Sequence, residues 1–247
     1  MATAPTVDEL SQALHSASRP LDAAGQRLAV ALYRALAEGE PVAAAELASR
    51  TGRSVEEITA TLDGWPNVFY DQHRQVIAFW GLALPKMPHR LEVAGRVLHA
   101  WCAFDPLFIV PLLGEPARVA STCPETGRPV SLTITSDGVT DVDPPGAVVS
   151  FLIPTKPWGN DVIRSFCHYV LYLASEEAGR RWNATQPGTL LLSVEQAFEV
   201  GGDSTRAASA PRWRTPCRRR VKTGLWRTSR DGNGATSALG WVRLLGM

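Results

Sequence analysis

The stretch Val68-Phe-Tyr-Asp-Gln-His-Arg-Gln-Val-Ile-Ala-Phe-Trp80 has two apolar runs on either side of a polar centre. Both runs, residues 68–70 and 76–80, are rich in β-branched and aromatic side chains, which favour strands. The polar residues 71–75 between them have the length and composition of a turn. We therefore predict a β-hairpin at residues 68–80.

Three helical patterns precede this hairpin. The first has apolar residues at helical spacing, and the second covers residues 42–50, between Pro41 and Gly52. The third begins with a capping box, Ser54-Val-Glu-Glu57, and runs to about residue 62. Three short helices and a hairpin are the order of a winged helix, so we expect a winged-helix-like unit over residues 20–84. The first helix is defined by Leu21, Leu28, Leu32 and Leu36.

The region after the hairpin is richer in predicted strands. Residues 85–88, Pro-Lys-Met-Pro, are expected to link the first unit to a second domain over residues 89–202. A last short helix is expected at residues 193–198. Tight turns between neighbouring strands indicate a mostly antiparallel sheet, and the fold class that we predict is α+β. The expected strands are residues 91–93, 96–98, 118–120, 130–134, 147–153 and 166–173.

Charge is distributed unevenly along the 247 residues. The formal net charge is only +1, which gives no overall attraction to nucleic acid or to an anionic membrane. Residues 1–202 nevertheless carry a net charge of −7, whereas residues 203–247 carry +8. This basic tail lacks hydrophobic periodicity and is predicted to be disordered, and so is the polar, Ala-rich segment 1–19.

The four cysteines are Cys102, Cys123, Cys167 and Cys217. The first residues lack the basic and apolar regions of a secretory signal, and no apolar run approaches the roughly 20 residues of a membrane span. We therefore expect a cytoplasmic protein that does not bind a membrane. Cysteines stay reduced in that compartment, so they indicate metal or nucleophilic chemistry more than a disulfide framework.

Cys102 and Asp105 stand three residues apart in Leu98-His-Ala-Trp-Cys-Ala-Phe-Asp-Pro106. Asp105-Pro106 is typical of a helix start, with Asp as N-cap and Pro at the first helical position. Cys102 would then lie just before a helix N-terminus, where the helix dipole favours the thiolate. Taken alone, however, the pair is more typical of an ordinary cap and a buried structural cysteine than of a reactive site.

Cys167 lies in Ser165-Phe-Cys-His-Tyr169, at the start of the predicted strand 166–173. Residues alternate between the two faces of a strand, so His168 is expected on the opposite face from Cys167. An isolated cysteine at such a position is most often a small core residue.

Together these segments resemble the organomercurial (alkylmercury) lyase family. The resemblance rests on Ala100-Trp-Cys-Ala-Phe-Asp105, on residues 118–133 around Cys123-Pro-Glu-Thr-Gly127, and on Arg164-Ser-Phe-Cys167. It covers about residues 20–200. It implies that residues 89–202 form a catalytic domain, that Cys102 and Cys167 bind mercury, that Asp105 shuttles the proton, and that Cys123 is structural. His168 stands where some members have a second cysteine.

The implied reaction is R–Hg⁺ + H⁺ → R–H + Hg²⁺. Mercury is a soft metal, and thiolates are its preferred protein ligands. Asp105 would accept the proton that a thiol releases on binding the metal and pass it to carbon. No cofactor is expected beyond soluble thiols that deliver the substrate and remove Hg(II), which would go to a mercuric reductase. Trp101 and Phe104 are candidates to line a pocket for the organic group, or are ordinary core aromatics.

Two other functions fit parts of the sequence. A winged helix can belong to a transcriptional regulator, but the candidate recognition helix at residues 54–62 carries Glu56 and Glu57, which repel phosphate. A metal carrier or sensor is the other alternative. The three Met residues are scattered, and the closest cysteines, Cys102 and Cys123, lack the spacing of a zinc ribbon.

Overall fold

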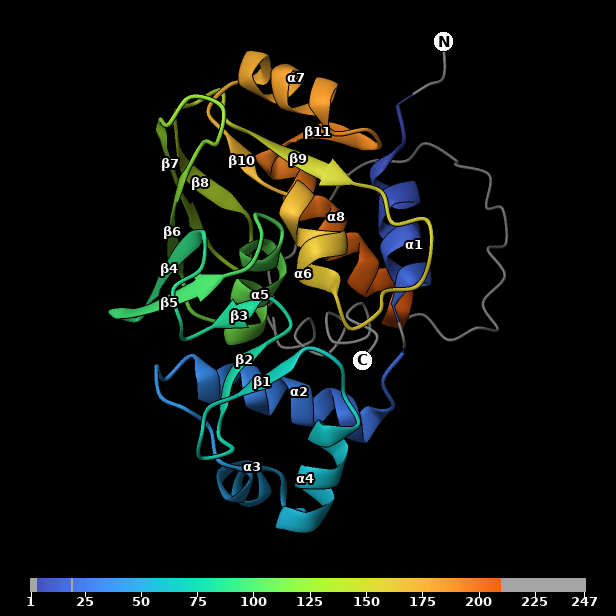
Figure 1. Cartoon of the computed structure of the whole chain (residues 1–247), viewed down its shortest axis with the longest axis vertical. Helices are drawn as coiled ribbons and strands as arrows, with labels where there is room; N and C mark the ends of the chain where they lie inside the picture. Colours follow the sequence, from blue (N-terminus) through green and yellow to red (C-terminus); the bar gives the residue numbers. More distant parts are fainter. Residues whose placement is uncertain (1–3, 19, 210–247) are drawn as a thin grey trace, which may run out of the picture.

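The computed structural model describes residues 4–18 and 20–209. It has two regions that share one large sheet (Figure 1). Most of the predicted basic tail lies outside the described residues. Its first part, residues 203–209, was predicted to be disordered but forms the end of the last helix.

The first region is the predicted three-helix unit with its hairpin. Helices α2 (Ala23–Leu36), α3 (Ala44–Thr51) and α4 (Val55–Asp63) are followed by strands β1 (Val68–Tyr70) and β2 (Val76–Phe79). Each boundary has a local cause: Asp22 caps α2, Gly52 ends α3 with φ 70°, and Ser54 and Glu57 form the predicted capping box of α4. The winged-helix-like order is therefore confirmed.

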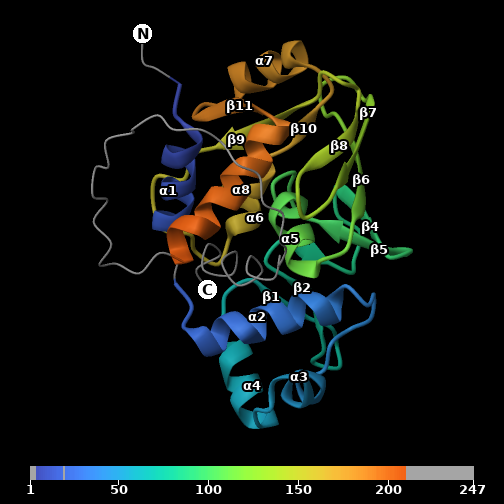
Figure 2. The same ribbon diagram turned by 180° about the vertical axis from the view of Figure 1, so that it is seen from behind.

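A further helix, α1 (Val7–Ala17), corrects the prediction that residues 1–19 are disordered. Its N-cap is Thr6, which forms a second capping box with Glu9. Leu10 and Leu14 lie one turn apart and are buried against the last helix, α8 (Val194–Ser209), which runs alongside α1 in Figures 1 and 2. The apolar stripe of α1 is short, and the distant helix α8 gives it a surface to cover.

The main sheet has eight strands, all paired antiparallel, in the order β1-β2-β3-β5-β4-β6-β7-β8. Strand β3 pairs with β2 on one side and with β5 on the other, so the hairpin of the first region is continuous with the second. Residues 85–88, predicted as an interdomain linker, therefore connect two strands of one sheet. The further strands are β3 (Leu82–Ala83), β4 (His89–Val93), β5 (Arg96–Ala100), β6 (Ala117–Thr122), β7 (Pro129–Ile134) and β8 (Val139–Asp143).

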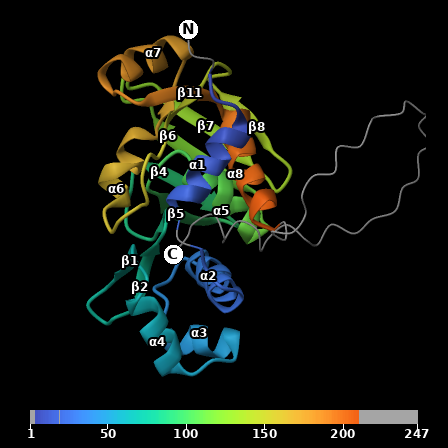
Figure 3. The ribbon, with the colours of Figure 1, turned by 90° about the vertical axis from the view of Figure 1, so that its right-hand side faces the viewer.

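A smaller antiparallel sheet, in the order β10-β9-β11, lies beside the main one. Its strands are β9 (Val148–Leu152), β10 (Tyr172–Leu173) and β11 (Thr189–Ser193), and α7 (Glu176–Thr185) packs on it. Helix α5 (Asp105–Leu113) is almost entirely buried and packs against α2, α8 and the main sheet. Figure 3 shows α2, α3 and α4 at one end of the molecule and α7 at the other.

The predicted strand at residues 166–173 is largely wrong. The chain there forms a short helix, α6 (Val162–Ser165), then a 3₁₀ turn, η1 (Cys167–Tyr169), and only then β10. The apolar run suggested a strand, but the amides of Tyr169 and Val170 bond to Phe166 and Cys167 within the same turn. The last helix is also longer than the expected residues 193–198.

Candidate active site

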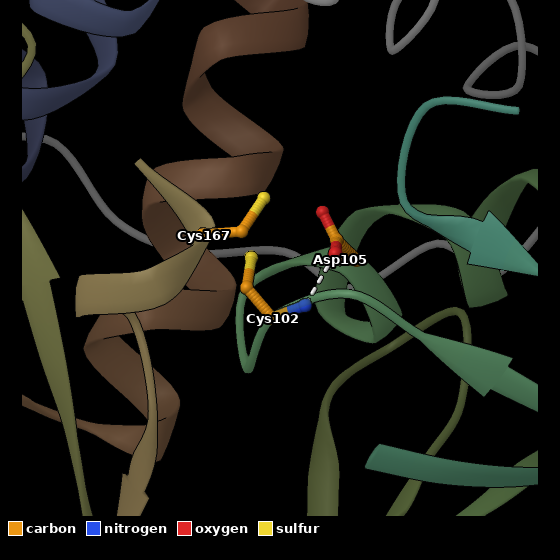
Figure 4. A group of neighbouring side chains, drawn as sticks. All are labelled: Cys102, Asp105 and Cys167. Carbon is orange, nitrogen blue, oxygen red and sulfur yellow. Dashed lines mark hydrogen bonds between the residues drawn. The ribbon is translucent and has the colours of Figure 1, made fainter. Parts of the chain in front are cut away.

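Cys102, Asp105 and Cys167 meet at one point in the interior. Their sulfur and carboxylate oxygen atoms all lie within 4.8 Å of one another, and all three side chains are buried. Figure 4 shows both sulfurs and the carboxyl group facing a common space. Of the described residues, these are the only three His, Cys, Asp or Glu side chains grouped closely enough to share a metal ion.

Cys102 and Asp105 are positioned by the turn that leads from β5 into α5. Asp105 is the first residue of the helix and Phe104 is its N-cap, so the predicted cap at Asp105 is displaced by one residue. The Asp105 carboxylate does not cap the helix. Instead its Oδ2 accepts a hydrogen bond of 2.7 Å from the backbone N–H of Cys102, three residues earlier. This bond holds the carboxyl group beside the Cys102 side chain.

Cys167 reaches the same point from the other side, at the start of the 3₁₀ turn η1. The backbone N–H of Ala103 donates to the carbonyl of Val170 at 2.9 Å and ties the Cys102 segment to the Cys167 segment. The Ser150 hydroxyl on β9 bonds to the carbonyl of Tyr169 and accepts from the Leu171 amide. The 3₁₀ turn is thus fixed between β9 and the Cys102 segment.

Burial controls the protonation of Asp105. Loss of hydration raises the pKa of its carboxyl group from the ordinary 3.8 to about 7, although hydrogen bonds from Cys102 and Trp101 act in the opposite direction. A carboxyl group with a pKa near neutrality can both accept and donate a proton at physiological pH. A side chain that caps a helix would have a lowered pKa, but the Asp105 carboxyl group does not cap α5.

Both thiols are harder to ionise than an exposed cysteine. Burial, the hydrogen bond with Cys167 and the charge of Asp105 raise the pKa of Cys102 well above its ordinary value. The hydrogen bond from Cys102 lowers the pKa of Cys167, but burial and Asp105 outweigh it, so its pKa is raised too. Desolvation therefore outweighs the stabilisation of a Cys102 thiolate that was expected from the helix dipole, and the neutral thiol is favoured. The free site has two thiols and a nearby carboxyl group that can accept their protons.

An aromatic pocket adjoins two of the three groups, Asp105 and Cys167. It has a volume of about 20 Å³, roughly the room that one water-sized group needs. Trp101 and Phe104 line it, as the sequence suggested. We did not predict Trp80, Gly81 or Trp158 in this lining. Gly81 carried a signal, because a glycine beside a strand often marks close approach of the backbone. The complete lining is Trp80, Gly81, Trp101, Phe104, Asp105, Phe108, Trp158, Val162, Phe166 and Cys167.

Comparison with known proteins identifies the family. A family model described as alkylmercury lyase matches residues 82–205, and one described as the helix-turn-helix domain of alkylmercury lyase matches residues 7–80. The alkylmercury lyase of Staphylococcus epidermidis is 40% identical over 170 residues, which are 69% of this chain and 77% of that protein. That of Pseudomonas putida is 37% identical over 193 residues, 78% of this chain and 89% of its own length.

The chain belongs to the alkylmercury lyase family. The resemblance drawn from the sequence is thereby confirmed. A solved structure described as the mercury-bound form of MerB2 has the same fold, with a TM-score of 0.61 at 19% identity, over 80% of this chain and 96% of that one. The predicted α+β class, with its helical N-terminal region and mostly antiparallel sheet, is also confirmed.

Two other residues singled out in the alkylmercury lyase motifs lie outside the three-residue cluster. Cys123 is buried in the turn between β6 and β7, where its N–H donates to the Arg128 carbonyl at 2.9 Å. His168 is exposed and its ring contacts that of Tyr169. Cys217 is outside the described residues.

Proposed function

We propose that Cys102 and Cys167 hold the mercury atom of an organomercurial substrate while Asp105 carries the proton that replaces it on carbon. Membership of the family makes the chain a lyase that acts on carbon–mercury bonds, in preference to a transcriptional regulator or a metal carrier. The observation that supports the residue roles is the convergence of two sulfurs and one carboxyl group in a buried site.

The first step is capture of the substrate from a small thiol, R–Hg–SR′. One cysteine thiol replaces R′–S on mercury, forming Cys–S–Hg–R and releasing R′–SH. Thiolate ligands suit mercury because both are soft. The two thiols are protonated in the free site, so metal binding must displace their protons.

Asp105 is within reach of both sulfurs. When the second cysteine binds mercury, its proton passes to the Asp105 carboxylate, and the added thiolate increases electron density on the metal and on the bound carbon. The carboxylic acid then protonates that carbon, which keeps the electron pair of the carbon–mercury bond. The products are R–H and Hg(II) bound by both sulfurs, with no change of oxidation state. A positioned proton donor contributes about 10²–10⁴-fold in rate.

Soluble thiols complete the cycle in this scheme, because they deliver the substrate and remove Hg(II), and no other cofactor takes part. A mercuric reductase is the acceptor that we propose for the product, and the cytoplasm, where thiols stay reduced, is the proposed location. No helix among residues 4–18 and 20–209 is long and apolar enough to cross a membrane.

The direct test is to mix the purified chain with excess thiol and phenylmercury or methylmercury, and to measure benzene or methane in the gas phase. We expect repeated turnover and one Hg(II) formed for each hydrocarbon released. Hydrocarbon release no faster than in a control with thiol alone would overturn the proposed function.

A further inference from the structure

The turn between β2 and β3, which directly follows the N-terminal hairpin, contacts the Asp105 carboxyl group. Its two residues, Trp80 and Gly81, both line the aromatic pocket. Both also have positive φ angles, 26° for Trp80 and 94° for Gly81. A positive φ is uncommon for a residue other than glycine, and such strain is concentrated at functional sites.

Gly81 lies so close to Asp105 that no side chain fits between them. A Cβ atom at Gly81 would be 2.6 Å from the Cγ and the Oδ1 of Asp105, and 2.8 Å from its Cβ. Those distances are far below van der Waals contact. Because the Cys102 N–H bonds to the Oδ2 of the same carboxyl group, the group is held between the backbone of Gly81 and the backbone of Cys102.

Hydrogen bonds from both regions fix the turn in this position. The Tyr33 hydroxyl, fully buried on α2, donates to the Trp80 carbonyl at 2.8 Å. The Trp80 indole N–H donates to the Pro66 carbonyl at 2.9 Å, just before β1. On the catalytic side, the Trp101 N–H donates to the Gly81 carbonyl at 3.1 Å.

We propose that Gly81 is a positioning residue for the proton carrier, and that Tyr33 holds it in place from the N-terminal unit. The bare backbone of Gly81 keeps the Asp105 carboxyl group against the Cys102 amide and excludes water from it. This role rests on the proposed function, because it matters only if Asp105 transfers the proton. The N-terminal region matches a family model described as a helix-turn-helix domain. In this proposal that region supports proton transfer in the active site.

Tyr33 lies close enough to the Asp105 carboxyl group for the charge of Asp105 to affect the pKa of Tyr33. Burial raises the pKa of Tyr33 well above its ordinary value, and the charge of Asp105 raises it further. Packing around Asp105 is what brings the pKa of its carboxyl group to about 7. Displacing the turn would admit water and return that pKa towards the ordinary range of a carboxyl group.

The test compares Gly81→Ala with Gly95→Ala. Gly95 lies in the turn between β4 and β5 with φ 76°, and apart from Gly95 and its two chain neighbours no atom of the described residues comes within 4 Å of the point that its Cβ would occupy. Both substitutions place a Cβ on a left-handed backbone, but only the one at Gly81 meets Asp105. Three quantities are measured with phenylmercury in excess thiol: kcat, the pH midpoint of kcat/KM, and the stoichiometry of Hg(II) binding from its thiolate-to-mercury absorption.

For Gly81→Ala we expect a kcat lower by about 10- to 100-fold, the scale expected when a reacting group is misplaced by about 1 Å. The midpoint should move below about 7, while one Hg(II) still binds per chain. Gly95→Ala should leave all three quantities unchanged. Wild-type kcat and midpoint in Gly81→Ala, or equal losses in both variants, would overturn the inference.

If Gly81→Ala does not fold, Tyr33→Phe decides the question. It removes the hydrogen bond to the Trp80 carbonyl and keeps the ring that packs on Phe79. We expect a drop in kcat of roughly 3- to 10-fold, the scale of one buried hydrogen bond, and a lowered midpoint; wild-type values of both would refute the role. Asp105→Asn separates the two proposals. Full turnover in Asp105→Asn removes the proton carrier itself, whereas an inactive Asp105→Asn beside a wild-type-like Tyr33→Phe removes only the role of the turn.

Discussion

The two segments that supply the site reach it in different ways. In the segment that ends at Asp105, a thiol and a carboxyl group stand three residues apart and are joined by a local hydrogen bond from Cys102. The segment around Cys167 brings a lone thiol, and it joins the first through contacts between residues distant in sequence, such as the hydrogen bond between Ala103 and Val170 and the packing on β9. The relative position of Cys102 and Asp105 is therefore set by local sequence, whereas the position of Cys167 depends on the tertiary fold.

The largest effect is expected from removing either sulfur. Cys102→Ser and Cys167→Ser should each fold and release no hydrocarbon above the thiol control, because a hydroxyl is a poor ligand for a soft metal. Cys123→Ser is the matched control, a buried cysteine outside the cluster, and should keep activity. Gas-phase hydrocarbon measurement distinguishes the three variants. Full activity in Cys102→Ser or in Cys167→Ser would contradict the two-thiolate scheme. It would show that only one of the two segments supplies a required sulfur.

The next largest effect concerns the carboxyl group. Asp105→Asn keeps an oxygen that can accept from the Cys102 amide, but it cannot carry a proton. We expect kcat to fall by about 10²–10⁴-fold while Hg(II) is still bound, because both sulfurs remain. Single-turnover hydrocarbon release and mercury binding, measured on the same sample, check this. Unchanged turnover would mean that the proton reaches carbon by another route.

A third effect appears in stability rather than activity. Because the pKa of Asp105 is raised to about 7 in the folded chain, the folded state holds a proton that the unfolded state releases above about pH 4. The resulting stabilisation is complete below the unfolded pKa and is lost as pH rises through about 7. At about 1.4 kcal/mol for each pKa unit, the loss is at most about 4 kcal/mol.

Urea unfolding at pH 4.5, 6 and 8 measures this loss. The wild type should lose stability as pH rises, whereas Asp105→Asn lacks the titrating group. The free energy of unfolding of Asp105→Asn should therefore increase relative to that of the wild type as pH rises. A constant difference between the two proteins across this range would show that Asp105 is not desolvated as described.

The smallest effect is expected next to Cys167. His168 follows it in the chain but is exposed and outside the cluster. His168→Ala should therefore change kcat and KM by less than about twofold, the range expected for an exposed position. Complete loss of activity would show that the Cys167 segment supplies a second catalytic group. In that case the Cys167 segment, like the Cys102 segment, would contribute two functional side chains.

Local signals in the sequence determined much of the fold. The capping box at Ser54 and Glu57, the hairpin at residues 68–80 and the turn at residues 94–95 all depend on neighbours a few residues apart, and each is present in the structure. The same applies to Cys102 and Asp105, whose spacing indicated that they would lie close together. The motifs around these residues were also sufficient to indicate the family.

The tertiary structure decided what depends on distant partners. Helix α1 exists as a packed element because α8 covers Leu10 and Leu14, and the 3₁₀ turn at Cys167 is fixed by β9 and the Cys102 segment. The protonation of the three site residues was also decided by the tertiary structure. The sequence predicted a helix dipole beside Cys102, but burial raises the pKa of both thiols and of Asp105. Desolvation depends on everything packed around a group, and Gly81, from another region of the chain, is part of that packing.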